Sequence, residues 1–177
     1  MKYFDEMKRT MEWVAQQQKT IFVGQAVGVP GTFMFNTIKD TPEEKRLELP
    51  VCESFQMQMT VGMAFSGYLP ISIYPRLNFL MLAMGDMSNI VDKIPEIYSQ
   101  KSPKVIIRSA VGPDSPVHPG HQHIGDFTEG FAKIFKNIEV VRLENPEDIF
   151  PAYQKVLDPK NNKSYLMIEV GNYYQQK

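Results

Sequence analysis

The stretch RLELPVCESFQMQMTVGMAFSG, residues 46 to 67, decides the expected fold. It predicts a short strand that ends at Pro50, because proline cannot continue a central ladder of hydrogen bonds, and then a helix that begins near Glu53. Methionine, alanine and glycine fill that helix, which is typical of a helix buried on several sides. In parallel α/β sheets, ligands bind where the carboxyl end of a strand meets the amino end of a helix. Glu53 is therefore the first candidate functional residue.

The length and composition indicate a single domain, residues 1–177. With 177 residues, of which 43% are hydrophobic and 22% charged, the chain can bury one core and is too short for two comfortable domains. Nineteen basic and twenty acidic residues give a net charge of −1. No block of like charge stands out, so we expect no nucleic-acid partner.

The sequence carries no recognisable targeting signal. Its first eighteen residues include Asp5, Glu6 and Glu12, where a signal peptide needs an uninterrupted apolar run. No apolar run of about eighteen residues, as a membrane-spanning helix requires, follows. The single cysteine, Cys52, excludes an internal disulfide framework and suits a reducing compartment. We therefore expect a cytoplasmic protein that does not cross a membrane.

Short apolar runs alternate with helical patterns along the chain. The expected strands are residues 20–24, 46–49, 69–74, 104–111, 138–142 and 164–170. The expected helices are residues 3–18, a segment from near residue 53, 77–93, 127–136 and 146–157, and the Gly-rich stretch 25–37 is expected to be a loop. This alternation predicts a three-layer α/β fold with a six-stranded, mainly parallel sheet and helices on both faces.

Right-handed crossovers would place the loops after four strands on one edge of this sheet. These loops begin at Gly24, Pro50, Tyr74 and Gly112. The polar and aromatic side chains collected there are Glu53, Tyr74, Arg76, Asn78, Phe79, His118, His121 and His123. By residue type alone, Glu53 is equally consistent with a helix-dipole contact and Phe79 with a core position.

The histidines lie in a Pro- and Gly-rich loop, residues 112–126, whose size is typical of a functional loop. A zinc site, and with it a metal-dependent hydrolase, is one interpretation of three imidazoles so close together. However, neither a cysteine nor a second carboxylate completes a metal signature, and Pro119 and Gly120 separate the histidines without helical spacing. We therefore expect no metal site and favour contact of the imidazoles with a substrate or a phosphate.

Three segments carry a resemblance to a known family. They are PVCESFQMQMTVGMAFSGYLPISIYPRLNFLMLAMGDMSNIVDK at residues 50–93, KVIIRSAVG at 104–112 and PGHQHIGDF at 119–127. Together they resemble the pyrimidine-binding domain of the transketolase-like, thiamine-diphosphate-dependent enzymes, and especially that of 2-oxo acid dehydrogenase beta subunits. The resemblance covers nearly the whole chain and implies the pyrimidine module of the thiamine-diphosphate-binding fold.

The resemblance implies a chemical role for Glu53. In this family a glutamate hydrogen-bonds the aminopyrimidine ring of thiamine diphosphate and so promotes loss of the proton from its thiazolium carbon, which then attacks a keto group. Glu53 matches that glutamate. Phe79 matches the aromatic residue that stacks on the pyrimidine, because both lie ten positions before a helical asparagine, here Asn89.

Four further residues complete the expected site. Arg76 and Asn78 are candidate cofactor-binding residues beside the stacking aromatic. His121 and His123 lie where the family places loop histidines near the reacting carbon, and the alignment does not choose between them.

The resemblance also implies partners. In this family the diphosphate and its Mg²⁺ are bound by a separate domain or chain, and the sequence shows no such module. The first loop carries Gln25 and Ala26 where many beta subunits have acids, and their carboxy-terminal domain does not follow Lys177. We therefore expect a separate diphosphate-binding subunit, self-association as a dimer and a small keto substrate. The chain would be half of a split transferase or 2-oxo acid dehydrogenase; the alternative is a non-catalytic assembly or regulatory subunit.

Overall fold

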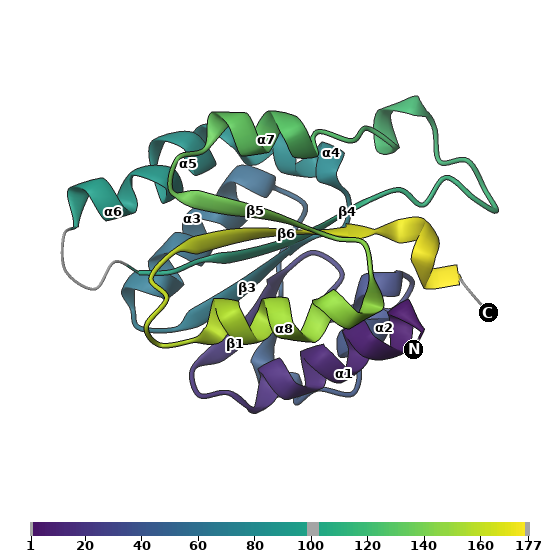
Figure 1. Cartoon of the computed structure of the whole chain (residues 1–177), viewed down its shortest axis with the longest axis horizontal. Helices are drawn as coiled ribbons and strands as arrows, with labels where there is room; N and C mark the ends of the chain where they lie inside the picture. The colour runs from purple at the N-terminus through teal and green to yellow at the C-terminus, as the bar shows by residue number, and fades with distance from the viewer. Residues whose placement is uncertain (1, 99–102, 176–177) are drawn as a thin grey trace.

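The computed structural model describes residues 2–98 and 103–175, which form three layers around a central sheet (Figure 1). All strand pairs in this sheet are parallel, and the strand order is β2-β1-β3-β4-β6-β5. The strands are β1 (Thr20–Gly24), β2 (Arg46–Glu48), β3 (Leu69–Tyr74), β4 (Ile106–Val111), β5 (Ile138–Leu143) and β6 (Ser164–Val170). The predicted six-stranded sheet is therefore confirmed.

Helices cover both faces of the sheet, as predicted. One face carries α1 (Tyr3–Gln16), α2 (Phe33–Ile38) and α8 (Pro146–Leu157); the other carries α3 (Glu53–Phe65), α4 (Leu77–Leu80), α5 (Met84–Asn89), α6 (Ile94–Ile97) and α7 (Thr128–Ile134) (Figure 1). The 3-10 turns are η1 (Glu43–Lys45), η2 (Met81–Ala83), η3 (Val91–Lys93), η4 (His121–His123) and η5 (Gly171–Gln175).

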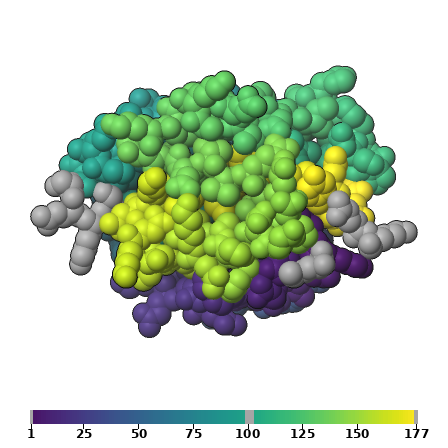
Figure 2. Space-filling model, in the orientation of Figure 1, coloured from purple at the N-terminus to yellow at the C-terminus, as the bar shows by residue number. Residues whose placement is uncertain are grey.

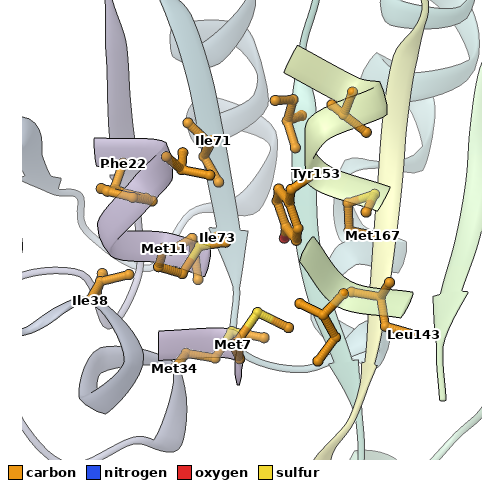
Figure 3. Packing of buried hydrophobic residues seen from close by; sticks show 14 of the residues in the cluster. Met7, Met11, Phe22, Met34, Ile38, Ile71, Ile73, Leu143, Tyr153 and Met167 are labelled. Atoms are coloured by element: carbon orange, nitrogen blue, oxygen red, sulfur yellow. The ribbon is translucent and has the colours of Figure 1, made fainter. Parts of the chain in front are cut away.

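The core on the α1 side shows why that helix docks on the sheet. Met7 and Met11, one helical turn apart, lie in one cluster with Ile73 of β3 and Met34 of α2, and all four side chains are fully buried (Figure 3). Burying each such side chain stabilises the fold by about 2 kcal/mol. Trp13, expected in the core, is partly buried beside it.

The C-terminal segment η5 packs against the N-terminal helix α1. Figure 2 shows the yellow end of the chain beside the purple one. The ring of Tyr3 meets those of Tyr173 and Tyr174 edge-on, at centroid distances of 5.6 and 5.2 Å, and its hydroxyl donates to the carbonyl of Leu143 at 2.8 Å. These contacts join the two ends of the described chain to the sheet.

The single helix predicted over residues 77–93 is wrong, because the structure divides it into α4, η2, α5 and η3. Leu77, Leu80 and Ala83 are all fully buried and lie three residues apart. A 3-10 turn has three residues per turn and keeps residues three apart aligned, whereas in an α-helix the same spacing drifts by about 60° at each step. The local spacing of buried residues therefore explains the break.

The loop predicted at residues 25–37 is also shorter than expected. α2 begins after Thr32, whose hydroxyl accepts a hydrogen bond from the backbone N–H of Phe35 at 3.1 Å. Threonine is a good N-cap residue, so the start signal was present in the sequence.

The expectation that α3 is buried on several sides is wrong for the chain by itself. One side packs on the sheet, while Phe55, Met59 and Phe65 on the opposite side are exposed.

Candidate functional site

The carboxyl ends of the parallel strands lie at one edge of the sheet, as predicted. β1 ends at Gly24, β2 at Glu48, β3 at Tyr74 and β4 at Val111. The candidate side chains lie at the ends of these strands, in the loops that follow them or in the first turns of the helices after those loops.

Glu53 is the first residue of α3 and is only 6% exposed. Its Oε1 accepts a hydrogen bond from Gln25 Nε2 at 3.3 Å, and its backbone carbonyl accepts one from the Tyr74 hydroxyl at 3.1 Å. Within residues 2–98 and 103–175, Glu53 Oε2 accepts no hydrogen bond. The positive end of the helix dipole favours a carboxylate here. The site therefore holds a buried carboxylate with one oxygen fixed and one available.

A chain of buried polar side chains continues from this carboxylate along α3. Gln25 Nε2 lies 3.5 Å from Gln56 Oε1, and Gln56 Nε2 donates to Ser72 Oγ at 3.0 Å. Thr60 also donates to Ser72 Oγ, at 2.9 Å. Sequence reasoning missed these residues, although Glu53, Gln56 and Thr60 have the i, i+3, i+7 spacing of one helix face.

Gly24 makes room for this polar chain at the end of β1. Its φ is +133°, and a Cβ at this position would lie 2.3 Å from Gln56 Nε2 and 2.5 Å from the carbonyl oxygen of Ile73. Any other residue at Gly24 would therefore displace the amide of Gln56 or the backbone of β3.

Glu48 at the end of β2 holds the first loop in place, a role that sequence reasoning missed. Its Oε1 accepts a hydrogen bond from Ala26 N at 3.0 Å, and its Oε2 accepts from Val27 N at 2.7 Å and Gly28 N at 2.6 Å. Ala26 has a φ of +58°, so consecutive N–H groups converge on one carboxylate. Neither Gln25 nor Ala26 is acidic, but the carboxylate of Glu48 in the neighbouring strand β2 binds the backbone of this loop.

Arg76 binds the backbone of the histidine loop. Its Nη1 donates to the carbonyls of Gly112 at 3.1 Å, His123 at 3.0 Å and Pro113 at 3.4 Å. Burial lowers the pKa of this guanidinium. Asn78 contributes a second contact, because its Oδ1 accepts a hydrogen bond from Gly125 N at 3.1 Å. Both side chains therefore fix the loop relative to the end of β3.

The three histidines fall into two separate groups. His123 packs edge-on against Phe79, with ring centroids 5.3 Å apart, and its buried Nδ1 has no hydrogen-bond partner in the described part of the chain. His118 and His121 are exposed and pack against each other at 5.2 Å. The structure thus distinguishes His123 from His121, which the sequence does not.

This arrangement gives no geometric support to a zinc site. Among the described residues, no group of three or more His, Cys, Asp or Glu side chains is placed to hold a metal ion. The described helices are likewise too short or too polar to span a bilayer.

The all-parallel six-stranded sheet with helices on both faces is the fold of the pyrimidine-binding module of transketolase-like enzymes. A solved structure described as "Split gene transketolase, inactive beta4 tetramer" shares it, with a TM-score of 0.70 and 12% sequence identity. The match covers 96% of this chain and 51% of that one, so this chain spans about half the length of the protein it matches. No protein-family model and no curated protein sequence matches. At this identity the likeness establishes the fold alone.

Proposed function

We propose that this chain is the pyrimidine-binding subunit of a split thiamine-diphosphate-dependent enzyme, of the transketolase or the 2-oxo acid dehydrogenase type. The observation that carries the proposal is Glu53, a buried carboxylate at the ligand-binding edge with Oε1 held by Gln25 and Oε2 without a partner in the described chain. That free oxygen is where the pyrimidine ring would be bound.

The other candidate side chains fit the same group. Phe79 is a half-buried aromatic ring on α4, and His123 beside it has a buried Nδ1 that lacks a hydrogen-bond partner within residues 2–98 and 103–175. Thiamine diphosphate would supply the nucleophilic carbon and the electron sink. Glu53 would hold or share a proton at Oε2, Phe79 would contact the pyrimidine face, and His123 would position or protonate the keto substrate.

Among the remaining candidates, we assign Arg76 and Asn78 an indirect role in cofactor binding. Their side chains fix the loop that carries His123, so their effect on the cofactor would pass through this loop. We favour His123 over His121 as the catalytic histidine, because His121 lies with His118 on the exposed part of the loop.

A partner subunit would bind the diphosphate and its Mg²⁺. Apolar side chains support this expectation, since Val29, Val51 and Val117 are exposed in the loops after β1, β2 and β4. These side chains lie in loops at the same edge of the sheet as Glu53, where a partner that covers this edge would contact them. The keto substrate would then bind between the two subunits, and this chain would be inactive alone.

The proposal is tested by mixing the chain with a candidate diphosphate-binding subunit. We expect calorimetry to detect thiamine diphosphate binding, with Mg²⁺, only for the mixture. Turnover of a 2-oxo acid or a ketose phosphate should likewise require both chains and the cofactor. A stable complex that neither binds the cofactor nor turns over these substrates would reject the proposal and favour a non-catalytic assembly subunit.

A further inference from the structure

The C-terminal turn η5 and the histidine loop, residues 112–126, leave the sheet at the same place (Figure 1). β4 and β6 are neighbouring parallel strands, and their last residues, Val111 and Val170, are paired in register. The loop starts directly after Val111, and η5 starts directly after Val170. The first residues of the two segments therefore lie side by side, at the sheet edge that carries Glu53.

Gly171, the first residue of η5, allows the two backbones to touch. It is buried, and a Cβ at this position would lie 2.5 Å from Pro113 N and 2.7 Å from the carbonyl carbon of Gly112. Any larger residue would push the start of the loop away from β6, because these contacts are with backbone atoms.

Asn172, the next residue, binds the loop through both polar atoms of its side-chain amide. Its Oδ1 accepts a hydrogen bond from Asp114 N at 3.1 Å, and its Nδ2 donates to Asp114 Oδ1 at 2.9 Å. The backbone N–H can only donate, so it fixes which way the amide points. Gln175 Nε2 adds a hydrogen bond to the carbonyl of Ser115. η5 therefore holds two consecutive residues of the loop.

These contacts hold a part of the loop that Arg76 and Asn78 do not reach. Arg76 binds the loop at residues 112, 113 and 123, and Asn78 binds it at residue 125. In the described part of the chain, every hydrogen bond that joins residues 114–122 to another element comes from η5. The segment that leads into His123 is therefore fixed from the end of β6.

We propose that Asn172 is a positioning residue of the candidate site, whose hydrogen bonds to Asp114 hold the histidine loop so that His123 stays against Phe79. The two rings pack edge-on with their centroids 5.3 Å apart. Displacing a reacting group by about 1 Å can cost roughly 100-fold in rate, so an anchor outside the site can matter to catalysis. The catalytic consequence rests on the proposed function, whereas the contact itself does not.

Exchanging the two side chains separates this role from a general effect on folding. Asn172→Asp places two carboxylates together and removes the amide that donates to Asp114, so it should release the loop. In Asp114→Asn/Asn172→Asp the pair is reversed. The carboxylate introduced at position 172 can accept from both the N–H and the new amide of position 114, which should hold the loop again. Asn162→Asp, on an exposed asparagine just before β6, is the matched control.

Proton NMR of the full chain alone measures the position of His123. In the wild type, the ring protons of His123 and Phe79 should give a nuclear Overhauser cross-peak, identified by its absence in His123→Gln. We expect Asn172→Asp to lose most of the intensity of this cross-peak, and the double variant and Asn162→Asp to keep it. An absent cross-peak in the wild type, an unchanged one in Asn172→Asp, or no recovery in the double variant would overturn the inference.

Kinetics of the proposed two-chain enzyme tests the consequence for catalysis. Asn172→Asp should lower kcat by about tenfold and leave the affinity for thiamine diphosphate unchanged, because it moves the histidine loop and not Glu53. The double variant should restore kcat. An unchanged kcat in Asn172→Asp would overturn the positioning role. If no mixture turns over even with the wild type, the proposed function alone fails, because the NMR measurement needs neither cofactor nor partner.

Discussion

The side-chain amide of Gln25 donates a hydrogen bond of 3.3 Å to the carboxylate of Glu53, across 28 positions of sequence. Both side chains are only 6% exposed. Gln25 directly follows β1 and Glu53 begins α3, so their proximity depends on the parallel pairing of β1 with β2 and β3. The amide fixes one carboxylate oxygen and leaves the other for a ligand.

Replacing this amide by an acid should make stability depend on pH. Gln25→Glu places a second carboxylate beside Glu53, and like charges this close oppose each other, so we expect a loss of about 2 kcal/mol at pH 7. Because repulsion raises the pKa of one of the two carboxyls, the loss should shrink as the pH falls from about 6 towards 4, where one carboxyl is protonated and can again donate a hydrogen bond. Urea unfolding between pH 4 and 8 measures this. Gln18→Glu, in an exposed turn, is the matched control. Equal pH profiles for the two variants would show that Gln25 does not contact Glu53.

Arg108 and Glu169 form a fully buried ion pair between β4 and β6. Burial acts to lower the pKa of the guanidinium, but the charge of Glu169 outweighs it and the pKa is raised. Arg108 Nη2 also donates to Thr37 Oγ1 of α2 at 2.9 Å. Arg108→Met would leave a buried carboxylate unpaired, so it should cost about 4 kcal/mol in urea unfolding. The double variant Arg108→Met/Glu169→Leu should recover most of that loss; no recovery would contradict this account.

Asp92 should stabilise the fold only above acidic pH. Its Oδ1 accepts hydrogen bonds from the N–H groups of Lys136 at 2.9 Å and Asn137 at 2.7 Å. Burial acts to raise the pKa of this carboxyl, but these N–H groups and the Lys93 ammonium outweigh it and hold the pKa below its ordinary value. The stabilisation is therefore complete above about pH 4 and is lost as the pH falls further.

The Asp92→Ala variant tests the direction of this pH dependence of stability. It should be about 2 kcal/mol less stable than the wild type at pH 7, and the difference should decrease below about pH 4. The exposed Asp5→Ala is the control and should change stability little. A difference between Asp92→Ala and the wild type that grows toward acid would refute the assignment.

The sequence predicts the sheet well because its strands are short, apolar and bounded by turn residues. It predicts helix continuity poorly at residues 77–93, where tertiary burial of Leu77, Leu80 and Ala83 overrides the local pattern. The roles of Gln25 and Glu48 depend on contacts between strand ends and are not encoded in local spacing. The strand–helix junction nominated Glu53 and the family resemblance implied its chemical role, whereas only the three-dimensional packing separates His123 from His121.

The two histidines should therefore behave differently in the proposed two-chain enzyme. His123→Ala should lower kcat by about 100-fold, a typical contribution of a general acid or base, while His121→Ala should change it by roughly twofold at most. Steady-state kinetics with saturating cofactor measures both. A larger loss of kcat for His121→Ala than for His123→Ala would assign the catalytic role to His121 instead.

The central claim is that the Glu53 carboxylate activates thiamine diphosphate, and Glu53→Gln tests it most directly. The variant keeps the size of the side chain but cannot exchange a proton at Oε2, so kcat of the reconstituted two-chain enzyme should fall by at least about 100-fold while subunit assembly is retained. Glu43→Gln, on an exposed glutamate of η1, should keep full activity. Full cofactor-dependent turnover by Glu53→Gln would contradict the account.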